Sequence, residues 1–269
     1  MKILLICVLY NSYEAFEKYI KSIENALFNS NGQVELDICV VDNSNEPIDI
    51  QNNYKNVRVR QIITHDNLGY FGGVKFAINS GNYRLSDYSY YIISNVDLIM
   101  DHTFFSELGK INLDKNIGCV APSIWSDIEH GDRNPKMIDR TNAKKLKLLR
   151  IMYKFPLLHM FYEKAFYLRR RKKVQDQRET YIYAPHGSFM LFTSSFRTFL
   201  SVMNYPVFLF GEEIFIAENL RKNHLKTVYQ PCLKIYDAEH VSTGTLKSKA
   251  YYRYNYEAVD MLLRRYFNE

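Results

Sequence analysis

The sequence lacks any uncharged apolar run of roughly 18 residues, the length a helix needs to cross a bilayer, so no transmembrane helix is predicted. Its first residues, MKILLICVLY, are too short for the hydrophobic region of a signal peptide and contain no small-residue cleavage site. We interpret them as a first core strand. The sequence also has no internal repeat and no low-complexity linker, so its 269 residues are expected to form one domain, 1–269.

Cysteine is also scarce: it occurs four times, at positions far apart and without a C-x-x-C pair. This spacing argues against a disulfide framework and against a zinc site of the usual kind. Cys7 and Cys39 lie inside apolar, strand-like runs. Such usage is typical of a reduced compartment, and we predict a cytoplasmic protein.

Basic residues dominate only one segment. Residues 144–173 contain eleven lysines or arginines and one acid, Glu163, which gives that segment a net charge of +10. Since the whole chain carries +6, the remainder is mildly acidic at −4. A nucleic-acid-binding protein more often spreads positive charge along its reading face. Because aromatic residues alternate with the basic ones and the chain has 22 tyrosines, a basic, Tyr-rich nucleic-acid-binding protein stays open as an alternative.

Strand and helix patterns alternate over the first half of the chain. Strands are expected at 3–9, 34–42, 57–64 and 89–94, and helices at 13–28 and 72–81. This alternation predicts an α/β fold with a mostly parallel, Rossmann-like sheet and flanking helices. In such a sheet, ligands bind beyond the carboxyl ends of the strands. Polar residues from three strands fall at those ends: Asn11, Asp42, Asn43 and Asp97.

The second half follows a different pattern. It is expected to contain strands at 117–125, within 180–192 and from 227, helices after Gly211 and at the C-terminus, and a basic helical insert over 139–176 that Pro156 interrupts. We accordingly divide the domain into 1–125, 126–246 and 247–269.

One stretch, YYIISNVDLIM (90–100), raises a question of chemistry. Its flanks are those of a buried strand, yet Asn95 and Asp97 stand in its middle. An unpaired carboxylate is costly to bury, so Asp97 requires a partner, an ion or water. One explanation is a strand end where Asn and Asp make a turn. The other is a bound ion.

The motifs of the chain, taken in order, resemble those of the inverting glycosyltransferases of family 2, which have the GT-A fold, and especially the rhamnosyl- and galactofuranosyl-transferase branch. The similar segments are VLYN (8–11), VVDNS (40–44), NLGYFGG (67–73), SNVD (94–97), HGSFML (186–191), FGEE (210–213) and EHVSTG (239–244). They span nearly the whole chain except the basic insert. No single segment is specific, so the resemblance depends on all seven occurring in the same order.

The resemblance implies a divalent cation, Mn²⁺ or Mg²⁺, held by Asp97 and by the late His240. Both ions prefer carboxylate and phosphate oxygen, so a bound ion would account for a carboxylate at the end of a buried strand. Asn95 is neutral where many members have Asp, so one anionic contact is expected from this turn. For His240, a loop histidine bonded to the backbone is the alternative.

The resemblance also implies a general base. Glu212 and Glu213 follow Gly211 at a predicted helix start, where the helix dipole by itself favours carboxylates. Family members use the second acid of the pair to take the proton of the attacking hydroxyl, which implies Glu213 as the base. Glu212 would support it or contact the acceptor. Members mostly have Asp in the second position, and Glu is one methylene longer.

The remaining site residues come from the same resemblance. Donor binding is implied for Tyr10, Asn11, Asp42, Asn67, Gly69, Gly73, Lys75, Asn95 and Asp97, and an acceptor-side role for Gly187 and Ser188. Asp42 would bond the pyrimidine base and Tyr10 would lie against the same nucleotide; a turn cap and a core edge are their alternatives. Lys75 stands where members often have Asn, and it would either contact phosphate or be solvated.

The function implied is metal-dependent, inverting transfer of a sugar in bacterial surface polysaccharide synthesis. The donor would be of the dTDP-rhamnose or UDP-hexose type, and the acceptor a saccharide or a polyprenyl-diphosphate-linked saccharide. Residues 1–125 would bind the nucleotide sugar and residues 126–246 the acceptor. A glycosidase also uses two carboxylates, but it would not need a nucleotide-binding rim.

The basic insert 139–176 suggests peripheral contact with an anionic membrane at the inner face of the cell membrane. The cations from Arg169 to Lys173 would supply charge, and apolar residues would add contact if exposed: Leu146, Leu148, Leu149, Ile151, Met152 and Phe155. The alternative is a helical hairpin that buries these apolar residues on the domain and leaves the charges solvated.

Overall fold

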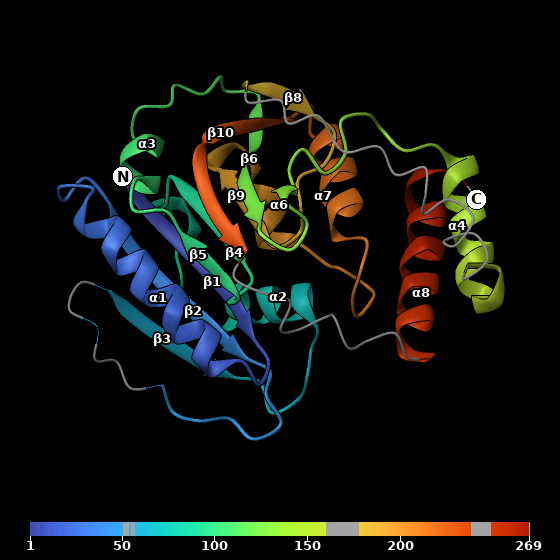
Figure 1. Ribbon diagram of the computed structural model, residues 1–269, viewed down its shortest axis with the longest axis horizontal. Coiled ribbons are helices and arrows are strands. Elements are labelled where there is room, and N and C mark those ends of the chain that lie inside the picture. Colours follow the sequence, from blue (N-terminus) through green and yellow to red (C-terminus); the bar gives the residue numbers. More distant parts are fainter. Residues whose placement is uncertain (51–53, 55–56, 160–177, 238–248, 269) are drawn as a thin grey trace.

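The computed structural model describes residues 1–50, 54, 57–159, 178–237 and 249–268. These residues form three layers, with helices on both faces of one twisted sheet (Figure 1). The predicted α/β fold is confirmed. The predicted strands and helices are found within one or two residues of their expected bounds in the N-terminal half.

The N-terminal half of the sheet is parallel. Its strands are β1 (Lys2–Leu9), β2 (Glu35–Asp42), β3 (Arg58–Ile63) and β4 (Tyr90–Ser94), in the order β3–β2–β1–β4. In register, Leu9 lies opposite Asp42 and Cys7 opposite Ser94. Because β1, β2 and β4 run in the same direction, the polar residues that follow them meet at one edge of the sheet, as predicted.

The other half of the sheet is mixed. Strands β6 (Ile117–Ser126) and β10 (Lys226–Asp237) are parallel to each other, and β9 (Phe189–Thr193) lies antiparallel between β4 and β6. Three short strands complete the sheet: β5 (Leu98–Met100) and β8 (Thr180–Ile182) pair with β10, and β7 (Gly131–Asp132) pairs with β6. The antiparallel β9 matters for function because it brings its own amino end to the carboxyl end of β4.

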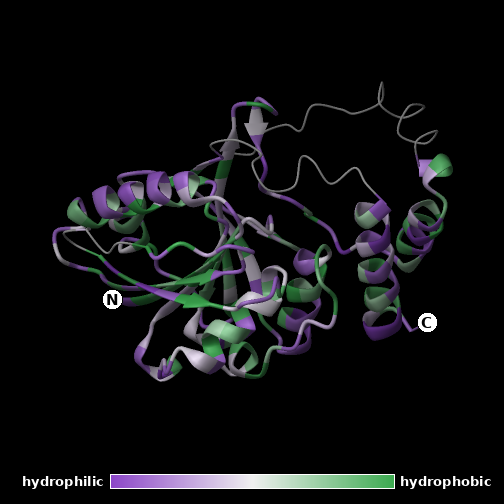
Figure 2. Ribbon diagram, turned by 90° about the horizontal axis from the view of Figure 1, so that it is seen from below, coloured by the Kyte–Doolittle hydropathy of each residue, from purple (hydrophilic) through white to green (hydrophobic). Residues whose placement is uncertain are grey.

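The helices cover the sheet in two layers (Figure 2). Helices α1 (Tyr13–Phe28) and α3 (Phe104–Leu108) pack on one face, and α2 (Tyr70–Ser80), α6 (Arg197–Val202) and α7 (Glu212–Lys222) on the other. Short 3₁₀ helices at Leu85–Asp87 and Ser194–Phe196 lie between longer elements. Strand β1 alternates its side chains, with Ile3 and Leu5 facing α1 and Leu4 and Ile6 facing the α2 layer. Burial on both faces explains its unbroken apolar run.

Helices α4 and α8 pair at one end of the molecule (Figure 1). Helix α4 (Ala143–Lys154) packs on α8 (Lys249–Tyr266) through Leu146, Val259 and Leu263. The side chain of Asn142 caps the start of α4 by accepting the Lys145 N–H at 2.8 Å. The helix stops before Phe155, since a residue followed by proline disfavours the helical conformation. Residues 156–159 are helical again, so Pro156 interrupts the insert as predicted.

Part of the basic insert falls outside the described residues, including the cationic run from Arg169 to Lys173. Among the helices of the described residues, none combines the length and the apolar character that crossing a membrane requires.

Candidate active site

The turn after β2 is built around Asp42. Its carboxylate is fully buried and accepts three hydrogen bonds: the Tyr13 hydroxyl and the Gln61 amide donate to Oδ2 at 2.8 Å, and the Ser44 N–H donates to Oδ1 at 3.0 Å. Asp42 therefore holds the turn in the manner of the cap that the sequence offered as an alternative. A contact to a nucleobase stays a prediction.

The loops after β1 and β2 are tied together at the same edge. Asn11 adopts a left-handed backbone (φ 51°), and its N–H donates to Ser44 Oγ at 2.8 Å. Asn43 is buried, and its side-chain amide donates to the carbonyl of Gly69 at 3.0 Å. Tyr10 is exposed over 41% of its surface, so it stands at the rim and is not part of the core.

The glycine-rich loop approaches a distant segment of backbone. Gly69 has a φ of +72°, and a Cβ there would lie 2.1 Å from the carbonyl oxygen of Phe208. Only glycine satisfies both conditions. Gly69 precedes the first residue of α2, and its N–H bonds to the side chain of Asn67 at 3.0 Å. Helix α2 therefore starts at Tyr70, two residues before its predicted start.

Two other predicted residues, Gly73 and Lys75, lie inside α2. A Cβ on Gly73 would lie 3.2 Å from Val8, so glycine allows α2 to pack closely on β1. Lys75 is exposed and its ammonium donates to the side chain of Asn204 at 2.9 Å. The structure therefore gives Lys75 a protein partner, where the sequence had left phosphate and solvent open.

The turn that carries Asp97 is joined to the start of β9. Ser94 pairs with Phe189, and the next N–H, that of Asn95, donates to the Ser188 carbonyl at 2.8 Å. Asp97 is half-buried at the end of this turn, directly before β5. The sequence could not predict this neighbour, because residues 95 and 188 meet only through the antiparallel pairing of β4 with β9.

The carboxylate of Glu213 is the next part of the candidate site. A Cβ on Gly187 would lie 3.2 Å from Glu213 Oε1, so the carboxylate packs directly over Gly187. The neighbouring Ser188 Oγ lies 2.9 Å from Nδ1 of His186. The predicted acceptor-side residues thus stand between the predicted base and the turn of Asp97.

Tyr70 is a central residue that the sequence reasoning missed. Its hydroxyl donates to the carbonyl of Gly187 at 3.1 Å. Burial raises the pKa of Tyr70 well above its ordinary value, and the negative charges of Glu212 and Asp97 add to this rise. Its signal in the sequence was the aromatic position of the NLGYFGG loop.

The two acids at the start of α7 occupy different environments. Gly211 precedes them with a φ of +81°. Glu212 is 7% exposed, and its Oε1 accepts the N–H of Phe210 at 3.0 Å. Burial, and then the charge of Glu213, raise the pKa of Glu212 to about 8. Glu213 is half-exposed. At neutral pH, Glu212 is therefore mainly neutral, and Glu213 is the acid that a ligand can reach.

Comparison with known proteins gives matches in three-dimensional structure only. Models of known protein families give no match, and a search of curated sequences likewise gives none. The chain is similar to a structure of GalNAc-T7 with UDP, GalNAc and Mn²⁺, with a TM-score of 0.54 and 11% identity over 98% of this chain and 48% of that one. It is also similar to S. aureus TarS 1–349, with a TM-score of 0.52 and 11% identity over 99% and 73% of the two chains. The chain has the GT-A fold. A complex of TarS 1–349 with UDP-GlcNAc matches at a TM-score of 0.50 and 10% identity.

At these identities the likeness extends to the GT-A fold alone. The chain spans about half the length of the GalNAc-T7 chain that it matches. No particular branch of the glycosyltransferases follows from the comparison.

Asp97 and His240 are the two residues for which metal binding was predicted. Among the described residues, no group of three His, Cys, Asp or Glu side chains is placed to hold a metal ion. His240, the second predicted metal ligand, lies outside the described residues. Asp97 provides a half-buried carboxylate, the oxygen ligand that Mg²⁺ and Mn²⁺ prefer.

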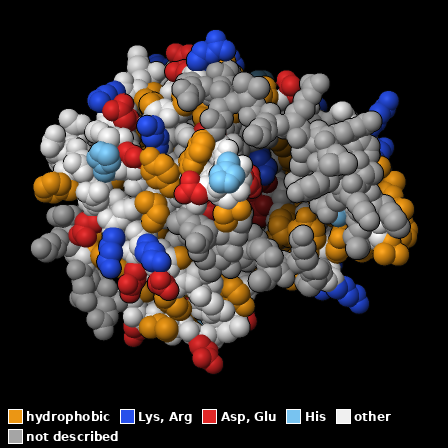
Figure 3. Space-filling view, viewed as in Figure 1, with side chains coloured by type: hydrophobic (Ala, Val, Ile, Leu, Met, Phe, Trp, Pro, Cys, Tyr) orange, Lys and Arg blue, Asp and Glu red, His pale blue; other side chains and the backbone are white. Residues whose placement is uncertain are grey.

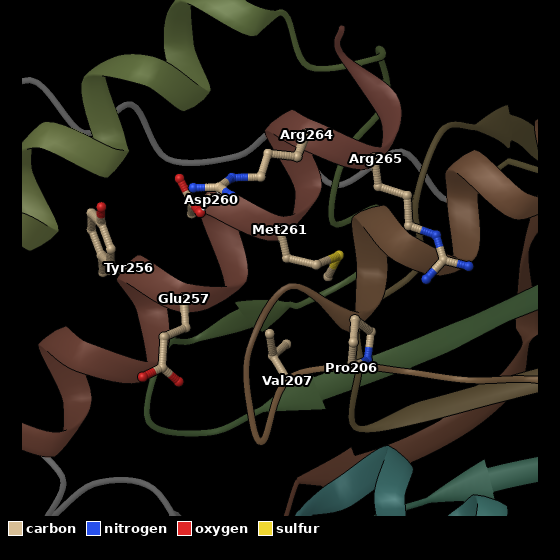
Figure 4. A pocket seen from close by; sticks show the side chains of 8 residues that line it. All are labelled: Pro206, Val207, Tyr256, Glu257, Asp260, Met261, Arg264 and Arg265. Atoms are coloured by element: carbon tan, nitrogen blue, oxygen red, sulfur yellow. Dashed lines mark ion pairs between the residues drawn. The ribbon is translucent and has the colours of Figure 1, made fainter. Parts of the chain in front are cut away.

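A separate pocket of about 450 Å³ lies between α8 and the segment that precedes the acid pair (Figure 4). Its apolar floor includes Pro206, Val207 and Met261, and its charged side chains come from α8. Asp260 is paired with Arg264 at 2.9 Å and with Arg150 of α4 at 3.0 Å. These charges join two helices, and none of the residues gathered around Asp97 and Glu213 lines the pocket.

We expect the Glu212→Gln variant to gain thermal stability relative to the wild type as the pH rises from about 5 to about 8. The folded-state pKa of Glu212, about 8, lies above its ordinary value of 4.5. Between these values the folded protein keeps a proton that the unfolded chain has lost, so the wild type loses stability as the pH rises. Glutamine removes this loss.

The measurement is the melting temperature of both proteins across this pH range. Glu257→Gln, which changes a more exposed carboxylate of α8, is the control and should follow the wild type. A constant difference between Glu212→Gln and the wild type would contradict the buried, proton-holding state of Glu212.

Proposed function

We propose that this protein transfers a sugar from a nucleotide-diphosphate donor to a hydroxyl group of an acceptor, with inversion at the sugar carbon. The observation that carries the proposal is the meeting of three segments at the carboxyl edge of the sheet. The Gly187–Ser188 segment connects the other two. Its Ser188 carbonyl accepts a hydrogen bond from the turn of Asp97, and its Gly187 packs against the carboxylate of Glu213. The GT-A fold, and neighbours whose structures contain UDP or UDP-GlcNAc, support a nucleotide sugar as the donor.

In the proposed reaction, Glu213 accepts the proton of the acceptor hydroxyl as that oxygen forms a bond to the sugar carbon. The bond from the same carbon to the diphosphate breaks, and the nucleotide diphosphate leaves. Glu212, buried and mainly neutral, fixes the start of α7 through Phe210 and so positions Glu213. Gly187 and Ser188 would lie beside the acceptor.

The donor would occupy the rim formed by Tyr10, Asn11 and Asp42, with its diphosphate toward the loop of Asn67, Gly69, Gly73 and Lys75. Asn95 and Asp97 would lie beside the diphosphate. A divalent cation, Mn²⁺ or Mg²⁺, would be held by Asp97, by donor phosphate oxygens and by His240, and it would offset the charge of the leaving diphosphate. Mn²⁺ in the GalNAc-T7 structure supports this ion type for the fold.

The finer assignments belong to the same proposal. We infer an inverting enzyme of the rhamnosyl- or galactofuranosyl-transferase branch that acts in the cytoplasm on a saccharide or polyprenyl-diphosphate-linked acceptor. The order of seven motifs in one chain supports this choice. Residues 1–125 would bind the donor and residues 126–246 the acceptor, and the C-terminal helix would complete the single domain.

The direct test is a panel of dTDP- and UDP-sugars incubated with the protein and Mn²⁺ or Mg²⁺, with released nucleotide diphosphate as the readout. We expect one donor to raise the melting temperature in the presence of metal and to release its nucleotide diphosphate when an acceptor is added. A protein that binds and cleaves no member of the panel, but binds RNA, would be the nucleic-acid-binding alternative. Cleavage of a glycoside without any nucleotide would indicate a glycosidase.

A further inference from the structure

Helix α4 and the residues just after it carry a second group of apolar side chains, which are exposed among the described residues. Five of the thirteen large hydrophobic side chains exposed in the described residues fall within eleven positions: Leu148, Ile151, Phe155, Leu157 and Leu158. Each exposes between 48% and 70% of its surface. In the space-filling view, hydrophobic side chains gather at the edge where Figure 1 places α4 (Figure 3). Leu148 and Ile151 are three residues apart, on one side of α4, and Phe155 directly follows the last residue of the helix.

The inner face of α4 is the face that packs against α8. Leu146 and Met152 are buried, and Leu149 and Tyr153 are half-buried against the α4–α8 contact. Of the apolar residues considered for membrane contact, Leu146 and Met152 are therefore buried, whereas Leu148, Ile151 and Phe155 are exposed. Stability of the fold does not explain the outward-facing residues.

The charge around these residues has one sign. Helix α4 contains no acid, and Lys144, Lys145, Lys147 and Lys154 are all exposed on it. Its other cation, Arg150, is paired with Asp260 on the α8 side. We call Lys144, Lys145, Lys147, Leu148, Ile151 and Phe155 the α4 outer face.

We propose that the α4 outer face docks on the surface of an anionic lipid bilayer. Lysines beside exposed leucine, isoleucine and phenylalanine match the two parts of that surface, since the cations meet anionic headgroups and the apolar side chains enter the acyl boundary. A second copy of the chain fits less well, because two such faces would bring two sets of lysines together and α4 carries no acid to pair with them. The proposal deepens the membrane contact that the sequence suggested, and it rests on the proposed function for the lipid-linked acceptor.

The docked helix α4 would be connected, through α8, to the segment that precedes the acid pair Glu212 and Glu213. Tyr251 and Tyr254 of α8 contact Phe210 and Phe208, with ring centroids 5.4 and 4.9 Å apart. Phe210 lies two residues before Glu212 and bonds to it through its N–H. The α4–α8 pair is thus the part of the molecule that joins a bilayer-facing surface to the acid pair.

The test is co-sedimentation of the full-length protein with vesicles at low salt. Vesicles of phosphatidylcholine alone are compared with an equimolar mixture of phosphatidylcholine and phosphatidylglycerol. We expect binding to the anionic vesicles only, and its loss on adding salt. A triple variant of the lysines (Lys144→Gln, Lys145→Gln, Lys147→Gln) should weaken binding by roughly 100-fold. A triple variant of the apolar residues (Leu148→Gln, Ile151→Gln, Phe155→Gln) should weaken it by at least about tenfold.

Matched controls change the same residue types elsewhere. Lys110→Gln, Lys115→Gln and Lys136→Gln remove three exposed lysines, and Ile48→Gln, Ile128→Gln and Val202→Gln remove three exposed apolar side chains. Both control proteins should bind like the wild type, and circular dichroism should show all variants folded.

The proposal is overturned if the wild type binds no anionic vesicles at low salt, or if both α4 variants bind as the wild type does. It is also overturned if the wild type forms a dimer that the apolar variant abolishes while vesicle binding is absent, since a second copy then covers this face. Loss of binding only when Arg169 to Lys173 are neutralised would likewise remove α4 from the role. Nucleotide release with a soluble acceptor is measured separately, so failure of vesicle binding and failure of the proposed function are distinguishable.

Discussion

The Glu213→Gln variant is expected to bind donor and metal like the wild type and to transfer sugar roughly 10²–10⁴ times more slowly, the usual contribution of a general base. Glutamine has nearly the same shape, so its packing over Gly187 is kept. It lacks the carboxylate that accepts the hydroxyl proton. The measurements are the rate of nucleotide diphosphate release with acceptor present and donor binding by thermal shift.

The neighbouring acid is the comparison. Glu212→Gln should lose less activity, because Glu212 is buried, mainly neutral and bonded to the Phe210 N–H. An amide can still accept that hydrogen bond through its oxygen. If Glu212→Gln is the inactive variant and Glu213→Gln stays active, the two roles are reversed.

The Asp97→Ala variant is expected to reduce transfer to the background level, a loss of roughly 10³-fold or more, while leaving the fold intact. The carboxylate stands in a half-buried turn beside the Gly187–Ser188 segment, where charge develops on the proposed leaving diphosphate. The same change should sharply weaken the Mn²⁺-dependent part of nucleotide binding, because one anionic ligand is lost.

Binding of the nucleotide sugar is measured with and without Mn²⁺ in wild type and variant. Asp87→Ala, which removes an exposed carboxylate shortly before β4, is the control and should change neither property. Unchanged turnover in Asp97→Ala would falsify the assignment of Asp97 as a metal ligand.

The order of motifs along the chain indicated which residues form the candidate site, but it did not show which other residues they contact. The sequence placed Asp42 and Asn43 at a strand end, and it could not show that Tyr13 and Gln61 would hold the Asp42 carboxylate. These partners lie 29 and 19 residues away in sequence. No local pattern records which side chain of a helix or a neighbouring strand reaches a given turn.

The local structure of this protein was determined by the sequence itself. Helices and strands such as α1, β1 and β2 follow from the spacing of apolar residues along a short stretch. This spacing involves only residues that are close in sequence. The parallel first half followed from the alternation of these elements, because a parallel pair needs a crossover between its strands.

Only the tertiary structure decided how the two halves meet. The antiparallel insertion of β9 beside β4 brings Ser188 to Asn95. A burial difference between adjacent positions raises the pKa of Glu212 and leaves Glu213 accessible. The tertiary structure also decides that Leu146 is buried and Ile151 exposed, although both lie on the same helix. Burial and strand pairing depend on residues far apart in the chain, and their energies are summed over contacts that no single stretch of sequence contains.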